Sequence, residues 1–408
     1  MRALLIWGGF ALLLAALPLT VESNLGIAIL NQMAIAIIFA LSYNMLLGQG
    51  GMLSFGHAVY FGLGGFLAAH AMLLTETGTL TIALVLVPLA GGVCGMLAAL
   101  FIGSFSTGRG GTVFTMISLG IGELFAAAAL VLVSLTGGEA GVSADRSLGP
   151  PLLGLDFTQD SHVYLLAAVW LFVCVLGMFL FTQTPAGRMA NAVRDNPMRA
   201  QGLGYNPQRV RLLSFVVAGF FAGIAGGLFA VHNEIVTGEA LTLNTAGQVL
   251  LMVYVGGVGV FLGPLVGAVL LTLINALLSQ YTALWMFYLG LLFVLTVMYL
   301  PGGLSALLLM HRGPWQRGRL HLLWRPYLLT ALPGAGLMLS LIALLEMSQR
   351  GAAPFVYLGV ALNPAGTGSW LALLAVAGLC ALGLHRTLPR LRAAWALASA
   401  HVPEQEQP

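Results

Sequence analysis

The chain consists of long apolar segments separated by short polar connections. The apolar segments lie near residues 3–20, 25–47, 57–75, 80–102, 112–136, 161–181, 212–232, 247–261, 263–280, 283–300, 327–346 and 367–385. A helix that crosses a bilayer needs about 20 mainly apolar residues, and most of these segments reach that length. The pattern therefore predicts an all-α, polytopic membrane helix bundle of about 10–12 spans, some of them broken by glycines.

Two regions of this pattern leave alternatives open. The segments on either side of Gly263 are short and interrupted by glycine and proline, so they can be two full crossings or two half-helices. The first segment follows Arg2 and can be a span or a cleaved signal peptide. We favour a span because no small-x-small cleavage site lies near Leu17 and Pro18.

Composition excludes several classes of protein. Of the 408 residues, 59% are hydrophobic and 7% charged, and the mean hydropathy is +0.97. A soluble domain carries about 25% charged residues, so a soluble enzyme, a nucleic-acid-binding protein and a disordered chain are all excluded. Cys94, Cys174 and Cys380 lie in apolar runs without C-x-x-C spacing, which predicts neither a metal site nor a disulfide framework.

The basic residues predict the orientation of the spans. All 16 of them are arginines, and with the N-terminus inside only Arg146 and Arg350 fall in outer loops. The acidic residues lean the other way, since the expected outer loops hold Glu22, Glu76, Glu139, Asp145, Asp156, Asp160, Glu234 and Glu239. Because arginine accumulates on the cytoplasmic side, the chain is expected to have both termini inside and an even number of spans.

A glycine-rich interruption follows the second apolar segment. Residues 42–65 contain the candidate pathway or gating residues Gly48, Gly50, Gly51, Ser54, Gly56 and His57. These glycines predict either close helix packing or a broken segment that lines a cavity. No second ligand lies near His57, which favours a hydrogen bond between helices over metal binding.

The longest polar interruption is the loop of residues 184–211. Thr184-Pro185, Asn196-Pro197 and Asn206-Pro207 are each suited to cap and start a helix. The loop is therefore expected to hold two short helices on the cytoplasmic face, either as a docking surface or as a simple arginine anchor for the topology. We favour docking, with the candidate residues Arg188, Arg194, Asp195, Arg199, Gly204 and Arg209.

A second glycine-rich interruption, at residues 255–268, echoes the first. Its candidate gating residues are Gly256, Gly257, Gly259, Gly263 and Pro264. Two interrupted segments in corresponding halves of a membrane protein indicate a transport pathway. The echo is short, and an internal repeat stays open.

Few polar residues lie inside the apolar segments. Asn31 and Ser42 share one face of the second segment, and Gln32 and Tyr43 form the adjoining stripe. Glu123 is the one acidic residue in the middle of a segment, and it is either functional or hydrogen-bonded to a neighbouring helix. These five residues are the candidate substrate contacts.

Motifs of enzymes are missing from the sequence. It contains no H-E-x-x-H, no G-x-S-x-G and no catalytic pair of carboxylates, so no enzymatic activity is expected. Without lysine there is also no phosphate-binding loop of the G-x-x-x-x-G-K-[ST] type. If ATP drives this protein, another chain must bind it.

Four stretches of the chain resemble the permease subunits of branched-chain amino-acid ABC importers, in particular the larger of the two homologous permeases. They are NMLLGQGGMLSFGHAVYFGLGG from residue 44, ISLGIGE from residue 117, GRMANAVRDNPMRAQGLGYNPQRVRLLSFVVAGFFAGIAGGLFA from residue 187, and VYVGGVGVFLGPLVGA from residue 253. The resemblance covers about residues 25–310 and implies an importer permease core at 1–311. Residues 312–408 extend beyond it, with two further expected spans and a cytoplasmic tail.

The resemblance also implies partners and a location. A homologous second permease, two ATP-binding cassette ATPases that bind the ATP, and an external substrate-binding protein would complete the importer in a bacterial inner membrane. The ATPases are expected to contact the loop at 187–204, and this chain needs no cofactor of its own. Urea or amides remain alternative solutes, and a secondary transporter that uses Glu123 remains an alternative mechanism.

Overall fold

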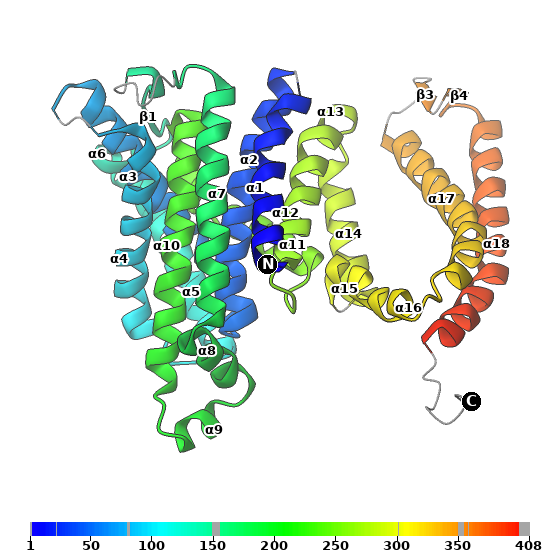
Figure 1. Cartoon of the computed structure of the whole chain (residues 1–408). Coiled ribbons are helices and arrows are strands. Elements are labelled where there is room, and N and C mark those ends of the chain that lie inside the picture. The colour runs from blue at the N-terminus through cyan, green and yellow to red at the C-terminus, as the bar shows by residue number, and fades with distance from the viewer. Residues whose placement is uncertain are drawn as a thin grey trace. The chain divides into compact units, whose positions relative to one another are not determined.

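The structure is a computed structural model that describes residues 2–21, 23–79, 82–148, 156–300, 302–349, 355–357 and 359–399. It forms two compact units (Figure 1). The first comprises Met1–Gln280 with Phe287–Ala306, and the second comprises Tyr281–Met286 with Leu307–Pro408.

Helices dominate the described part of the chain. Up to residue 310 the α-helices are α1 (Arg2–Thr20), α2 (Asn24–Asn44), α3 (His57–Glu76), α4 (Val87–Ser106), α5 (Thr112–Val131), α6 (Val133–Thr136), α7 (Asp160–Gln183), α8 (Pro185–Asp195), α9 (Pro197–Gly202), α10 (Pro207–Asn233), α11 (Leu243–Gly256), α12 (Gly263–Leu273), α13 (Ser279–Tyr281), α14 (Trp285–Tyr299) and α15 (Gly303–Met310). Two π-helical segments, η1 (Met45–Gln49) and η5 (Ile274–Leu278), continue α2 and α12, and 3-10 turns lie at η2 (Leu84–Leu86), η3 (Arg146–Leu148) and η4 (Gly238–Leu241).

The expected membrane bundle is confirmed. Within the described ranges, nine helices are long and apolar enough to cross a membrane, or ten if α14 and the bent segment after it count as one span. Of the alternatives left open on either side of Gly263, the segment at 247–261 is a short helix and the one that follows is a full-length span. Helix α11 of the first segment has 14 residues, about 21 Å, against a hydrocarbon layer of about 30 Å. The glycines after it turn the chain back, and α12, η5 and α13 together form a segment of full length, Gly263–Tyr281.

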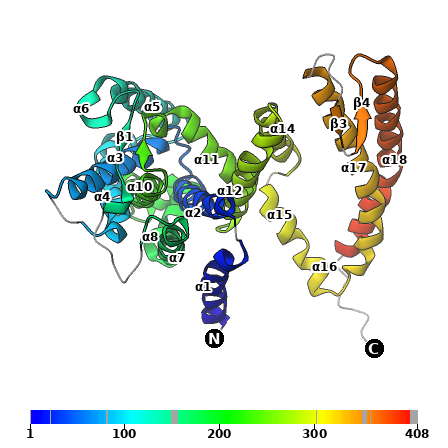
Figure 2. The same cartoon turned by 90° about the horizontal axis from the view of Figure 1, so that it is seen from above.

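Glycines bring α3, α4 and α10 into direct backbone contact in the first unit, where Figure 2 shows the three helices side by side. A methyl group added at Gly64 would lie 2.6 Å from the Cα of Gly223, and one added at Gly91 would lie 2.6 Å from the Gly223 carbonyl oxygen. In a membrane the hydrophobic effect does not drive helices together, so close packing of small residues must hold them. Backbone contact at these glycines therefore holds α4 against α3 and α10.

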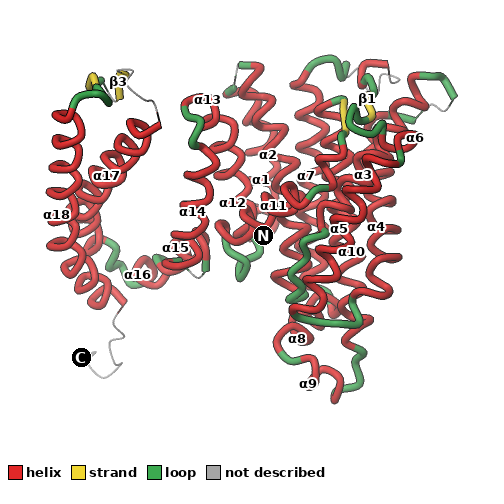
Figure 3. Tube along the Cα trace, turned by 180° about the vertical axis from the view of Figure 1, so that it is seen from behind, coloured by secondary structure: helices red, strands yellow, loops and turns green. Residues whose placement is uncertain are grey.

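A short pairing closes the end of this unit opposite α8 and α9. Strand β1 (Val142–Ser143) pairs antiparallel with β2 (Ile235–Val236), with Val142 opposite Val236. The pairing ties the connection between α5 and α7 to the end of α10 (Figure 3). By the arginine rule this is the outer end.

The second unit is a helical hairpin. Its elements after α15 are α16 (Arg312–Gln316), α17 (His321–Gln349), β3 (Phe355–Tyr357), β4 (Val360–Leu362) and α18 (Thr367–Ser399), and β3 and β4 pair antiparallel between the long helices. The hydroxyl of Tyr327 joins the two helices, because it accepts a hydrogen bond from Trp395 Nε1 at 2.9 Å and lies 2.7 Å from His311 Nε2. Both α17 and α18 are long and apolar enough to span a membrane, as expected for this region.

The glycine contacts predict a selective loss of stability. Gly223→Ala places a methyl group against the Gly91 carbonyl and should cost about 1–3 kcal/mol by overpacking. Gly290→Ala is the matched control because no atom lies within 4 Å of its added methyl. Thermal unfolding in detergent should show a lower midpoint for Gly223→Ala alone. Equal midpoints would contradict the close-packing account.

Candidate functional site

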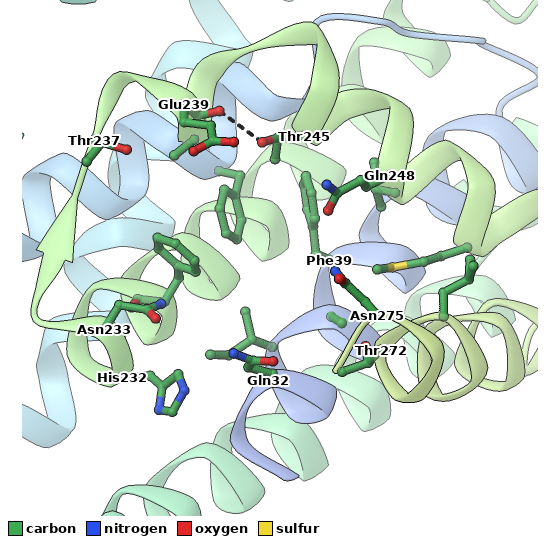
Figure 4. A pocket seen from close by; sticks show the side chains of 18 residues that line it. Gln32, Phe39, His232, Asn233, Thr237, Glu239, Thr245, Gln248, Thr272 and Asn275 are labelled. Atoms are coloured by element: carbon green, nitrogen blue, oxygen red, sulfur yellow. Dashed lines mark hydrogen bonds between the residues drawn. The ribbon is translucent and has the colours of Figure 1, made fainter. Parts of the chain in front are cut away.

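A cavity of about 310 Å³ lies among α2, α3, α10, α11 and α12 in the first unit (Figure 4). Its apolar lining includes three aromatic rings, Phe39, Phe61 and Phe229. The side chains that line it are Gln32, Ile35, Ala36, Phe39, Phe61, Phe229, His232, Asn233, Thr237, Glu239, Ala240, Thr245, Gln248, Val249, Met252, Leu271, Thr272 and Asn275. Its size is at the lower end of the range of about 300–1,000 Å³ for small-molecule sites, so it suits a small solute.

Several polar groups of this cavity come from the ends of helices and from short or π-helical segments, and Gln32 and Thr272 come from α2 and α12. His232 and Asn233 end α10, Thr245 and Gln248 lie on the short helix α11, and Asn275 lies in the π-helical segment η5. Within this lining, Thr245 donates its hydroxyl hydrogen to the backbone carbonyl of Glu239 at 2.9 Å. The cavity combines an aromatic wall with neutral amides and one carboxyl, that of Glu239, which is exposed.

The expected polar stripe on α2 divides between the cavity and helix packing. Of its four residues only Gln32 lines the cavity. Asn31 is buried and donates to the Asp160 carbonyl on α7 at 3.3 Å. Ser42 bonds to His57 and Tyr43 donates to the Ser54 carbonyl at 3.0 Å, so these side chains hold helices together.

Sequence reasoning missed most residues of the cavity. Gln248, Thr272 and Asn275 are single polar residues between apolar neighbours, and that isolation is the one feature that marks them in the sequence. Asn233 lacks even this mark, because it lies between His232 and Glu234. The aromatic residues carry no such mark because 9% of the chain is aromatic.

The first glycine-rich interruption is packed against its neighbours. Gly56 lies against α5, where a methyl group at Gly122 would meet its Cα at 3.4 Å, and Phe55 N donates to Ser118 Oγ at 3.1 Å. His57 Nε2 lies 2.9 Å from Ser42 Oγ, which is the hydrogen bond between helices that its isolation suggests. None of Gly48, Gly50, Gly51 or Gly56 lines the cavity, so a gating role for them stays a prediction.

The expected capped helices of the 184–211 loop are confirmed. The Thr184 hydroxyl accepts from Gly187 N at 3.2 Å and starts α8, and Asn196 Oδ1 accepts from Arg199 N at 2.9 Å and starts α9. Asn206 caps α10 in the same way, at 3.0 Å from Gln208 N. Gly204, with φ +90°, follows α9 in a backbone region that glycine tolerates.

Helix α8 is attached to the π-helical end of α2. Arg194 donates from Nη1 to the Gly48 carbonyl, and Asn191 Nδ2 donates to Gln49 Oε1 at 2.7 Å. The Arg194 side chain also pairs with Asp195, with Nη2 and Oδ1 2.9 Å apart. These contacts join the loop to the helix that carries Gln32 and Phe39 to the cavity.

The two glycine-rich interruptions meet in space. A methyl group added at Gly48 would lie 2.9 Å from the carbonyl oxygen of Val258, in the turn between α11 and α12. That turn depends on Gly257, whose φ is +115°, and it is followed by Pro264 in the first turn of α12. Gly256 and Gly263 lie against each other's backbone, whereas Gly259 has no atom within 4 Å of an added methyl. The two similar glycine-rich interruptions, at residues 42–65 and 255–268, are therefore in contact.

Ion pairs fasten the outer end of the unit beside the cavity. Arg146 Nη2 lies 2.7 Å from Asp160 Oδ1 on α7, and Arg146 Nε lies 3.5 Å from Glu234 Oε1 after α10. The guanidinium also donates to the carbonyl of His232 at 3.2 Å. Next to it, hydrogen bonds from the Ser147 hydroxyl and backbone N–H lower the pKa of the Asp145 carboxyl. The pairing of Arg146 with two carboxylates gives a structural reason for an arginine in an outer loop.

Comparison with known proteins places the chain in a family. The family described as "Branched-chain amino acid transport system / permease component" matches residues 25–301. The chain belongs to this permease family. It is therefore a multi-pass protein of the bacterial inner membrane, as the apolar helices and the arginine pattern indicate.

Individual relatives agree with this assignment. The high-affinity branched-chain amino acid transport system permease proteins LivM of Salmonella typhimurium and Escherichia coli are 30% and 29% identical over 294 residues, which is 66% of this chain and 67% of each relative. The autoinducer 2 import system permease protein LsrC of an Enterobacter species is 32% identical over 151 residues, 35% of this chain and 43% of that protein. No solved structure matches the chain.

The outer ion pairs predict a local loss of stability. Arg146→Met leaves the carboxylates of Asp160 and Glu234 without their partner and should cost about 1–3 kcal/mol. Hydrogen exchange should accelerate first at the amides of residues 142–148. Arg109→Met, which removes an exposed arginine at the other end of the unit, is the control. Unchanged exchange at 142–148 in Arg146→Met would contradict a fastening role.

Proposed function

We propose that this chain is a transmembrane permease subunit of an ATP-driven importer for branched-chain amino acids, and that the solute passes through the cavity beside α2. The observation that carries the proposal is the attachment of the loop helix α8 to α2, the helix that lines this cavity. The cytoplasmic loop helix α8 and the cavity-lining helix α2 are thereby joined by hydrogen bonds, so that a movement of α8 can reach the solute site.

The chemistry of the cavity suits a small amino acid with an apolar side chain. Phe39, Phe61 and Phe229 offer an aromatic wall that matches a branched aliphatic group. Gln32, Gln248 and Asn275 offer amide donors and acceptors for a carboxylate and an ammonium group. This lining favours an amino acid over urea, which has no apolar part to place against the rings.

The loop of α8 and α9 suits docking of an ATPase. Met198 and Leu203 are 76% and 73% exposed, although they lie in a polar loop at the cytoplasmic end. Exposed apolar side chains beside exposed arginines such as Arg188, Arg199 and Arg209 are typical of an interface with another protein. ATP itself is then bound by two separate ATPase subunits, since this sequence lacks a phosphate-binding loop.

The remaining partners follow from the same proposal. A homologous second permease completes the membrane core, and a substrate-binding protein delivers the solute at the outer end. Closure of the ATPase pair would pull on α8, and Arg194 and Asn191 would pass that movement to η1. The two states of the cavity must differ in their contacts for this movement to have an effect.

Filling the cavity should block transport without unfolding the protein. Ala36→Phe adds a ring to the cavity wall, and we expect at least a tenfold loss of leucine uptake in cells. Leu97→Phe, on the exposed side of α4, should leave uptake unchanged. Normal uptake by a well-expressed Ala36→Phe variant would exclude this cavity as the pathway.

The docking surface should be separable from the cavity. The double variant Met198→Asp and Arg199→Glu should lose a co-purifying ATPase, identified by mass spectrometry, and lose uptake as well. Arg392→Glu, an exposed arginine of α18, is the control. Retention of the ATPase by the double variant would refute docking at α9. Uptake that continues without ATP but stops without the membrane gradient would instead support a secondary transporter.

A further inference from the structure

Helix α5 has one packed face and one face that no described residue of the first unit covers. Its packed face holds the glycine-rich interruption, because Thr115 donates to the Leu53 carbonyl at 3.0 Å and Ser118 accepts from Phe55 N. On the opposite side Met116 is 73% exposed, and Gly120 and Ala127 follow it at helical spacing. An added methyl at Gly120 would meet no atom within 4 Å.

Glu123 lies on this exposed face at membrane depth. It is the twelfth residue of the 20-residue helix, about 17 Å from its start and so close to the middle of the hydrocarbon layer. Among the described residues it has neither an ion pair nor a side-chain hydrogen bond, and its side chain does not line the cavity. A carboxyl group in this position is costly against lipid, and such groups almost always face protein or water.

The exposed side of α4 provides a comparison within the same unit. Its exposed residues through the same depth are Leu89, Val93, Leu97, Leu100 and Phe101, without a polar or small side chain among them. The face of α5 differs in two ways, since it carries a carboxyl group and two small residues. Small residues at helical spacing allow another helix to approach closely, and polar groups then hydrogen-bond across the contact.

We propose that the α5 face formed by Met116, Gly120, Glu123 and Ala127 is the contact with a transmembrane helix of the second permease. The Glu123 carboxyl bonds to a hydrogen-bonding group on that helix, and Gly120 and Ala127 let the two backbones approach. The inference rests on the proposed function, because it needs a permease core of two chains. It gives this carboxyl a role in assembly, distinct from solute contact or proton coupling.

Photo-crosslinking in native membranes tests the contact directly. A benzoylphenylalanine residue replaces Met116 in one variant and Leu97, 56% exposed on α4, in the control. We expect an adduct with the mass of two permease chains from position 116 and no protein adduct from position 97. Peptide mass spectrometry must identify the captured chain as a second copy or as the homologous permease. Lipid adducts alone at position 116, or equal protein adducts at both positions, would overturn the proposal.

Two substitutions of Glu123 test the carboxyl itself. Glu123→Gln keeps a hydrogen-bonding group and should keep the two-chain complex in size-exclusion chromatography. Leucine is at least as compatible with a membrane helix as glutamate is, so Glu123→Leu should not disturb insertion. We expect this variant to reduce the fraction of the two-chain complex at least fivefold. An unchanged complex with Glu123→Leu would refute the role of the carboxyl.

Purification of the wild-type chain together with crosslinking at position 116 separates an error in the α5 contact from an error in the proposed function. If the wild-type chain purifies with an ATPase and a second permease but position 116 captures neither permease, only the α5 contact is wrong. If the wild-type chain purifies without any permease partner and transports without ATP, the proposed function is wrong and this contact falls with it.

Discussion

Peptide groups inside a bilayer have no water to bond with, and this constraint decides where the helices of this permease can be broken. Between α2 and α3 the chain leaves the helical path at residues 50–56, and side chains from other helices supply the missing bonds. Thr115 donates a hydrogen bond to the Leu53 carbonyl and Tyr43 donates one to the Ser54 carbonyl. Ser118 accepts one from the Phe55 N–H. The break is possible because α5 lies beside it. Placing α5 there also leaves its opposite face, with Glu123, turned out of the unit.

The same constraint explains the cavity. A helix that ends within the membrane, or that widens into a π-helical turn, leaves some backbone polar groups without a partner in the same helix. Helix α11 stops after 14 residues, and η5 widens the helix that follows it. Gln248 reaches the cavity from the short helix α11 and Asn275 from the π-helical segment η5, while α2, α3 and α10 contribute the three aromatic rings.

Local features of the structure were predictable from the sequence, and features that depend on distant contacts were not. Thr184-Pro185 and Asn196-Pro197 start helices because a cap needs only its own next residues. The spans follow from hydropathy for the same reason. By contrast, Asn31 and Gln32 are neighbours with equal polarity, yet Asn31 bonds to α7 and Gln32 lines the cavity. Which of them faces the cavity depends on where α7 and α12 pack, and that information is not contained in the spacing along α2.

Helix α2 runs between the two ends of the unit. It is buried along most of its length and regular up to residue 44, so we expect it to be rigid. A rigid helix passes on a displacement, whereas a flexible one absorbs it. At the end of α2, in η1, the Gly48 carbonyl is one of the last carbonyls of the helix, which lack a partner within the helix, and it accepts a hydrogen bond from Arg194. The guanidinium of arginine suits this position better than an ammonium group, since its planar group can bond to Gly48 and pair with Asp195 at once. The contact between loop and bundle is therefore made at the π-helical end of α2, next to the regular helix that continues to Gln32 and the cavity.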